Sequence, residues 1–277
     1  MKAKRLTDCS KCCIHTITTK PWPLEVAVEK YSHAGIGGIS VWRKAFQGLN
    51  PKNAGTLIRD SGLKIVSLVR GGFFPHQTES GRRKAIEENL KIIDEAAELG
   101  APLIVLVCGA VPGQSLDMSR GQIRDGLENI LPYAAECGIQ LSIEPLHPMY
   151  ADDRSAINNL STANDIVESF ATPSLGITID IYHLWWDPQL QQEIDRCGRH
   201  QNIFSFHICD WKTPTVDLLN DRGIMGEGCI PVKQIRGWME SAGFSGFNEV
   251  EIFSHKYWQM DQDAYLKKIV HAYLNYV

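Results

Sequence analysis

The sequence lacks an apolar run of membrane-spanning length, and it lacks an excess of basic charge. Its 28 lysines and arginines are outnumbered by 32 aspartates and glutamates, for a formal net charge of -4. Because tight binding to a phosphate backbone needs a basic surface, no nucleic-acid partner is expected. The N-terminal segment has basic residues but no apolar core behind them, unlike a secretory signal. We therefore expect a cytoplasmic protein without a membrane partner.

Two further signatures are missing. Cysteines cluster at Cys9, Cys12 and Cys13, but no second C-x-x-C pair is present to complete a structural zinc site. We expect these residues to be free thiols without a catalytic role. The segment "GIGG" at 35–38 precedes an apolar run instead of following one, so it is not a dinucleotide-binding turn. No glycine-rich phosphate cradle is visible either.

Eight short apolar runs alternate with stretches of helical periodicity along the 277 residues. The runs cover residues 12–17, 37–42, 63–69, 102–108, 139–145, 175–181, 203–209 and 247–253. Several helical stretches end in a glycine just before the next run, namely at Gly35, Gly62, Gly100, Gly138 and Gly243. Without a linker or low-complexity tract, this alternation predicts one α/β domain over residues 1–277, a (β/α)8 TIM barrel. The alternative, a doubly wound open sheet, usually has fewer strands and a glycine-rich first turn.

Potential metal ligands stand at the ends of four consecutive runs, where a barrel of this kind places its chemistry. They are Glu144, Asp180, His207 and Glu251. Each alone is commonly a helix cap, an ion-pair partner or a hydrogen-bonded core residue. Together, three carboxylates facing one pocket repel one another, and a divalent cation removes the cost of burying them. The oxygen-rich set favours Mn²⁺ or Mg²⁺, is compatible with Co²⁺, and suits Zn²⁺ less.

The motifs around these residues resemble those of the xylose isomerase-like TIM barrels, a family of sugar phosphate isomerases and epimerases that includes ketose 3-epimerases. The resemblance spans nearly the whole chain and is carried by "IEPLHP", "TIDIYHLWWD", "FHICDW", "DRGIMGEGCIPV" and "EVEIF". It implies one metal ion on the four ligands, with Glu144 and Glu251 also acting as the acid/base pair. It further implies that His183 and Arg222 bind substrate oxygens, and that Trp185 walls the mouth of the site.

Some positions depart from the family pattern. Zinc-dependent AP endonucleases of the same superfamily have histidine ligands where this chain has Gly223 and Cys108, so a trinuclear zinc site is incomplete here. The loop "EPLHPMYADDR" is not that of ketose epimerases, so His147 is a substrate-binding candidate without a role taken from the family. Arg43 and Arg70 fall at the ends of the second and third runs. If both point inward with Arg222, the substrate carries a carboxylate or another electron-rich group.

The expected reaction is proton transfer on a keto sugar through a metal-stabilised enediolate. One glutamate removes the proton and the other returns it, at the same carbon for epimerisation or the next for isomerisation. Loss of a β-oxygen would instead give a lyase acting on a 3-keto sugar or glycoside, and this alternative stays open. A non-catalytic sugar-binding barrel would need only one of the two glutamates. The expected partner is a small carbohydrate; the particular sugar and any homo-oligomeric assembly are left open.

Overall fold

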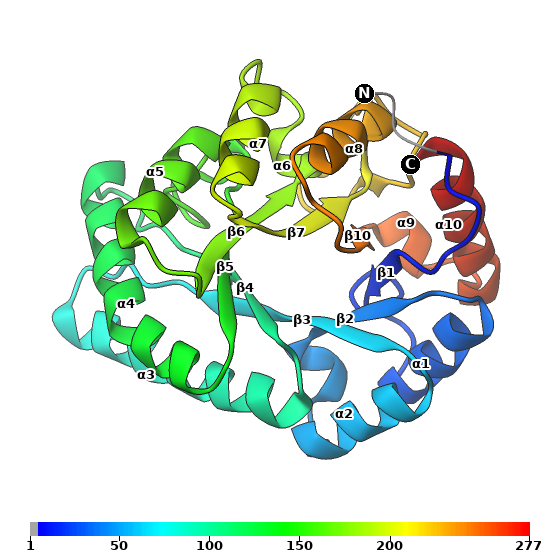
Figure 1. Cartoon of the computed structure of the whole chain (residues 1–277), viewed down its shortest axis with the longest axis horizontal. Helices are drawn as coiled ribbons and strands as arrows, with labels where there is room; N and C mark the ends of the chain where they lie inside the picture. Colours follow the sequence, from blue (N-terminus) through cyan, green and yellow to red (C-terminus); the bar gives the residue numbers. More distant parts are fainter. Residues whose placement is uncertain (1–4) are drawn as a thin grey trace.

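The computed structural model describes residues 5–277. Eight parallel strands form a closed barrel in the order β1-β10-β7-β6-β5-β4-β3-β2, and helices form an outer ring around it (Figure 1). The barrel strands are β1 (Cys12–His15), β2 (Gly38–Trp42), β3 (Lys64–Gly72), β4 (Leu103–Val107), β5 (Gln140–Ile143), β6 (Leu175–Asp180), β7 (Ile203–Ile208) and β10 (Asn248–Val250). Seven of the eight apolar runs contain one strand each, and the run 63–69 covers most of β3, which extends to Gly72; this confirms the TIM barrel.

The helices connect successive strands, as the periodicity predicts. They are α1 (Leu24–His33), α2 (Pro51–Asp60), α3 (Glu79–Leu99), α4 (Leu116–Glu136), α5 (Leu160–Phe170), α6 (Ile181–Leu184), α7 (Leu190–Arg199), α8 (Val232–Ser241), α9 (His255–Trp258) and α10 (Gln262–Tyr276), with short 3₁₀ turns η1 (Arg43–Phe46) and η2 (Pro148–Tyr150). All five glycines predicted to end helices have positive φ, as Gly100 shows at the end of α3 with φ of 81°. Residues with a Cβ rarely adopt that conformation, so these glycines stop each helix before its strand.

The barrel has an apolar outer layer and an interior that is polar beneath the predicted ligands, while Val69 and Val105 face inward from β3 and β4. Alternate strand residues such as Ile143, Ile179 and Val250 point outward and are fully buried in the layer between sheet and helices. The other set points into the barrel, because side chains alternate along a strand. Two residues before each predicted ligand, this inner set consists of Ser142, Thr178, Ser205 and Glu249, all at most 1% exposed.

Glu249 is the centre of this inner layer. Its carboxylate accepts hydrogen bonds from the Ser205 hydroxyl at 2.5 Å, the Ser40 hydroxyl at 2.6 Å and His15 Nε2 at 3.1 Å. The hydroxyls of Ser142 and Thr178 lie 2.6 Å apart, on β5 and β6. The layer of side chains beneath the predicted ligands is therefore hydrogen-bonded, whereas branched apolar residues usually fill this layer in such barrels.

A small hairpin follows β7 and delivers Arg222 to the barrel mouth. Its strands, β8 (Asp210–Trp211) and β9 (Arg222–Gly223), pair antiparallel. The Asp210 carboxylate accepts backbone N–H groups of Gly226, Gly228 and Ile230, each at 2.9 Å. Because three backbone donors converge on one carboxylate, the loop after β9 is fixed against the end of β7.

The cysteines are unpaired, as expected from the sequence. All eight thiols are free, and Cys9, Cys12 and Cys13 are buried. Burial raises the pKa of the Cys12 and Cys13 thiols well above the usual value, so both stay protonated. Within residues 5–277, no helix has the length and apolar character needed to cross a membrane.

Candidate metal centre

The structure brings the four predicted ligands together. Glu144 directly follows β5, Asp180 ends β6, His207 lies in β7 and Glu251 directly follows β10, and these four strands are neighbours in the barrel. One donor atom from each side chain lies within 4.8 Å of the others. All four residues are at most 5% exposed. The neighbouring strand ends are what place residues so distant in sequence around one point.

The donor atoms fit a divalent ion. Glu144 Oε1 and His207 Nδ1 are 3.3 Å apart, yet both are buried without a hydrogen-bond partner. Such groups are costly to bury unless something satisfies them. The three carboxylates and one imidazole could hold a divalent ion, and a bound ion would satisfy both unpartnered atoms.

The shifted pKa values in the cluster show which positive charges a metal ion would replace. Burial alone would lower the pKa of His207, but the adjacent carboxylates of Glu144 and Glu251 hold it well above its usual value. Burial raises the pKa of Asp180 to about 6, only partly offset by Arg222. Without a metal ion, protons therefore supply part of the positive charge that balances the three carboxylates.

His15 is a member of the cluster that the sequence analysis missed. Its Nδ1 lies 3.0 Å from Glu251 Oε1, and its Nε2 lies 3.1 Å from Glu249 Oε2. His15 thus connects the predicted ligand Glu251 to Glu249 in the hydrogen-bonded layer beneath it. The signal in the sequence was its place in the first apolar run, two residues after Cys13 on the same strand face.

Arg222 and His183 form a second unit beside the ligands. Arg222 Nη1 lies 2.9 Å from Asp180 Oδ2 and 3.1 Å from Glu251 Oε2, while Nη2 lies 3.2 Å from His183 Nε2. Burial, reinforced by Arg222, lowers the pKa of His183 well below its usual value, so the imidazole is neutral. A guanidinium can only donate, so Nε2 accepts and the ring proton is on Nδ1. This Nδ1 is buried without a hydrogen-bond partner, which leaves one N–H to offer.

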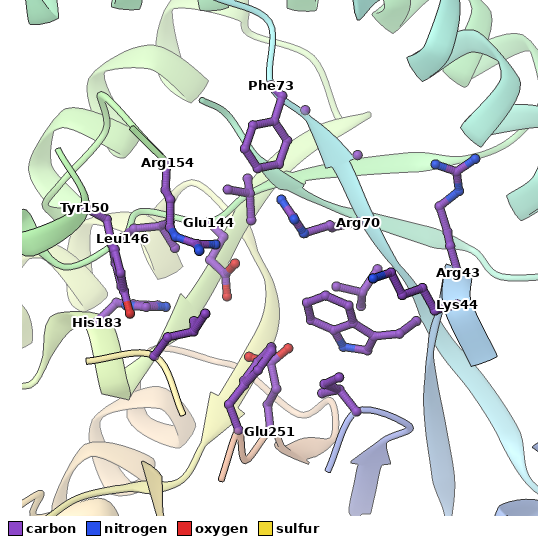
Figure 2. Close-up of a pocket in the computed structure, with 18 of the residues that line it drawn as sticks. Arg43, Lys44, Arg70, Phe73, Glu144, Leu146, Tyr150, Arg154, His183 and Glu251 are labelled. Carbon is purple, nitrogen blue, oxygen red and sulfur yellow. The ribbon is translucent and has the colours of Figure 1, made fainter. Parts of the chain in front are cut away.

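A cavity of about 560 Å³ opens beside the cluster. Its lining includes Glu144, His183, Arg222, Glu251, Arg70 and Arg154, and Figure 2 shows most of these side chains around the opening. This volume is in the range of small-molecule sites. Both glutamates predicted to transfer protons therefore face the same space.

Three other predicted substrate-binding residues lie differently. Arg43 is at the rim, where its guanidinium pairs with Glu95 at 2.6 Å and Glu88 at 2.9 Å and points away from the ligands (Figure 2). Arg43 therefore does not join Arg70 in pointing inward. Trp185 and His147 do not line the cavity; they pack against Trp211, with ring centroids 5.6 Å and 5.2 Å away. A substrate contact by either of these two residues stays a prediction.

The described residues offer one metal centre. Two groups could hold an ion, and they share His207 and Glu251. Neither contains Cys108, whose buried thiol donates to the Leu106 carbonyl at 3.8 Å. Gly223 has no side chain to donate. Within residues 5–277, neither Cys108 nor Gly223 therefore supplies the ligand that a histidine provides at that position in a trinuclear zinc site.

Comparison with known proteins places these features in a family. Residues 28–272 match the family described as xylose isomerase-like TIM barrel. The inosose isomerase of Halalkalibacterium halodurans is 24% identical over 212 residues, which cover 74% of this chain and 72% of that protein. The fructoselysine 3-epimerase of Shigella flexneri is 23% identical over 257 residues, covering 83% and 85%.

Solved structures give the same fold. Protein SMc04130 from Sinorhizobium meliloti 1021 superposes with a TM-score of 0.93 at 44% identity, covering 96% of this chain and 98% of that one. The IOLI protein with a bound zinc atom superposes with a TM-score of 0.83 at 20% identity, covering 96% and 99%. At that lower identity the likeness shows the fold alone.

Proposed function

This chain belongs to the xylose isomerase-like TIM barrel family, and from this membership we propose that it is a divalent-metal-dependent isomerase or epimerase of a keto sugar. The observation that carries the proposal is the shared position of Glu144 and Glu251, which both line the cavity and both belong to the ligand cluster. The inosose isomerase and the fructoselysine 3-epimerase among its relatives support this class of reaction.

The metal would be held by Glu144, Asp180, His207 and Glu251. An ion held there would polarise a substrate carbonyl and stabilise negative charge on its oxygen. The oxygen-rich set favours Mn²⁺ or Mg²⁺ over Zn²⁺, and one ion per chain is expected. Metal analysis of the purified protein tests this, because two or three zinc ions per chain would contradict a mononuclear centre.

The two glutamates would transfer the proton. Burial would raise the pKa of Glu251, but His15 and His207 hold it well below its usual range, so this carboxylate is ionised at neutral pH. Glu144 keeps one buried oxygen without a hydrogen-bond partner. The two side chains come from β5 and β10, on different sides of the cluster, so they reach a substrate carbon from different directions. One removes the proton and the other returns it.

His183 and Arg222 would hold the substrate oxygens. The unpartnered Nδ1–H of His183 is a neutral donor in a buried setting, suited to a hydroxyl or carbonyl oxygen. Arg222 lies over Tyr182 and Phe253, at 4.3 Å and 4.9 Å from their ring centroids, which fixes the plane of its guanidinium. Both residues therefore present donors whose directions are set before substrate arrives.

Replacing each glutamate tests the proposal. Metal-loaded wild type, Glu144→Gln and Glu251→Gln are incubated with ketoses and inososes in D₂O, and the C–H signals are followed by NMR. Gln preserves the shape and can offer a carbonyl oxygen to the ion, but its amide cannot act as the base, so turnover should be lost in both variants. Exchange retained in one variant only would identify the base for that direction. Glu98→Gln, an exposed position on α3, is the matched control.

The outcomes separate the alternatives. Full turnover by both metal-loaded variants would place the base elsewhere and refute the proposal. A lyase would give an unsaturated sugar that absorbs in the ultraviolet, because loss of a β-oxygen follows the same proton removal. Sugar binding by wild type without any exchange would indicate a binding protein.

A further inference from the structure

Two arginines face the cavity beside the metal ligands. Arg70 lies in β3 and Arg154 in the loop that follows η2, and both line the cavity. Figure 2 shows the two guanidinium groups on either side of Glu144, turned toward each other. Sequence analysis singled out Arg70 but not Arg154.

The backbone fixes the positions from which the side chains of both arginines extend. The register between β3 and β4 shifts between Val69 and Gly71, so Arg70 lies at an irregularity of the strand, where the direction of a side chain can change. Arg154 is tied to the end of β4, because its carbonyl accepts the Gly109 N–H at 2.9 Å. The next residue, Ser155, forms a β-bridge with the same glycine. The positions of these two side chains are therefore built into the barrel mouth.

Neither arginine has a carboxylate partner. Among residues 5–277, no Asp or Glu oxygen pairs with either guanidinium, and Nη1 of Arg70 is buried without a hydrogen-bond partner. Aromatic rings hold them instead: Arg70 lies 4.3 Å from the Phe73 ring centroid, and Arg154 lies 5.4 Å from that of Tyr150. A ring supports the face of a guanidinium and leaves the N–H groups at its edge available.

The charges around the cavity indicate what these N–H groups are for. With a divalent ion bound, the three carboxylate ligands keep one negative charge, and Arg222 offsets it through its contacts with Asp180 and Glu251. Arg70 and Arg154 then add two positive charges without a directly paired carboxylate, and only Glu144 and Glu251 attract Arg70 across the cavity. Burial, followed by repulsion from Arg154, lowers the pKa of Arg70, which is the direction expected for an unpaired cation.

We propose that the substrate carries an anionic group, a carboxylate or a phosphate, which binds between Arg70 and Arg154 while the keto end lies at the metal ligands. This inference rests on the proposed function and narrows its substrate class to acidic keto sugars. Arginine suits this role, because its planar fork matches both anions and keeps its charge at any physiological pH. Arg43 is not part of this site, because Glu88 and Glu95 already balance it.

Calorimetric titration of the Mn²⁺-loaded protein tests the inference without turnover. The ligands are glucitol, gluconate and glucitol 6-phosphate, which share a six-carbon polyol and differ in charge. We expect at least one anion to bind about tenfold or more tightly than glucitol, as pairing with a partly buried charge predicts. The anion that binds more tightly, gluconate or glucitol 6-phosphate, identifies whether the site prefers a carboxylate or a phosphate.

Variants assign the preference to the two arginines. Arg70→Gln and Arg154→Gln should each remove most of the preference for the anion over glucitol. Arg83→Gln, an exposed arginine on α3 with the same loss of charge, should keep it. Equal binding of all three ligands by wild type overturns the inference. So does a preference that both variants retain, because the anion would then bind the ion directly. Solvent exchange with keto sugars tests the proposed function separately, so the failure of one is distinguishable from that of the other.

Discussion

Glu249 offers the sharpest test of the hydrogen-bonded layer inside the barrel, since it is buried beneath the predicted ligands and does not line the cavity beside them. We predict that Glu249→Gln lowers both the free energy of unfolding and the affinity for the metal ion. The side chain is 1% exposed and accepts from Ser205 on one oxygen and from Ser40 and His15 on the other. Gln keeps one accepting oxygen, so at least one donor faces an amide nitrogen that cannot accept.

The magnitude follows from these contacts. A hydrogen bond to a charged group contributes about 1.5–3 kcal/mol, and the bonds that remain to a neutral amide are weaker. We therefore expect a loss of about 3 kcal/mol in the free energy of unfolding. For a denaturation slope of about 3 kcal/mol per molar urea, this lowers the urea midpoint by about 1 M in the metal-free protein. The denaturation curve must be shown to be reversible for this conversion to hold.

Metal affinity gives a second, independent readout. His207 Nε2 lies 3.9 Å from Glu249 Oε2, on the side of the ring opposite the ligand atom. At this distance His207 Nε2 has no hydrogen-bond partner, so Glu249 acts on the ring through its charge, and we expect its removal to weaken metal binding by less than the about 10–100-fold typical of a hydrogen-bonded carboxylate. Glu249→Asp, which keeps the charge, separates loss of charge from loss of shape, and Glu98→Gln is the exposed control. An unchanged urea midpoint together with unchanged Mn²⁺ affinity would refute the reasoning.

Two further predictions concern substrate binding and backbone geometry. His183→Ala should lower kcat/KM by about tenfold or more while metal analysis still finds about one ion per chain; loss of the ion would mean that His183 is a ligand. Gly72→Ala should prevent folding or lower the urea midpoint severely, because φ is +106° and a Cβ would lie 2.1 Å from a β4 carbonyl oxygen. Gly121→Ala in α4, where a Cβ would meet nothing within 4 Å, should instead be neutral or stabilising by up to about 1 kcal/mol; equal effects of the two glycine substitutions would contradict this.

Much of the scaffold was predictable because strand runs and helix-ending glycines are local signals. The ligand positions followed from one rule, that polar residues at the ends of neighbouring parallel strands converge. His15 and Glu249 were missed because they lie within apolar runs, where only the inward parity of the strand marks them. Arg154 was missed because its place depends on a loop path that no local pattern defines. Arg43 follows β2 as expected, but the direction of its side chain depends on two glutamates of α3.

The alternation of inner and outer residues has a consequence for how this chain tolerates change. Ile143 lies between Ser142 and Glu144 at the end of β5, and Ile179 lies between Thr178 and Asp180 at the end of β6. Point replacements on the inner set can alter the reaction while the apolar contacts of the outer set persist. Inserting or deleting one residue within β5 or β6 would exchange the inward-facing and outward-facing sets. An isoleucine would then point toward the metal ligands, and a carboxylate would point toward the helices. Diversification of this barrel is therefore open to substitution within its strands, while changes of length are confined to the loops between them.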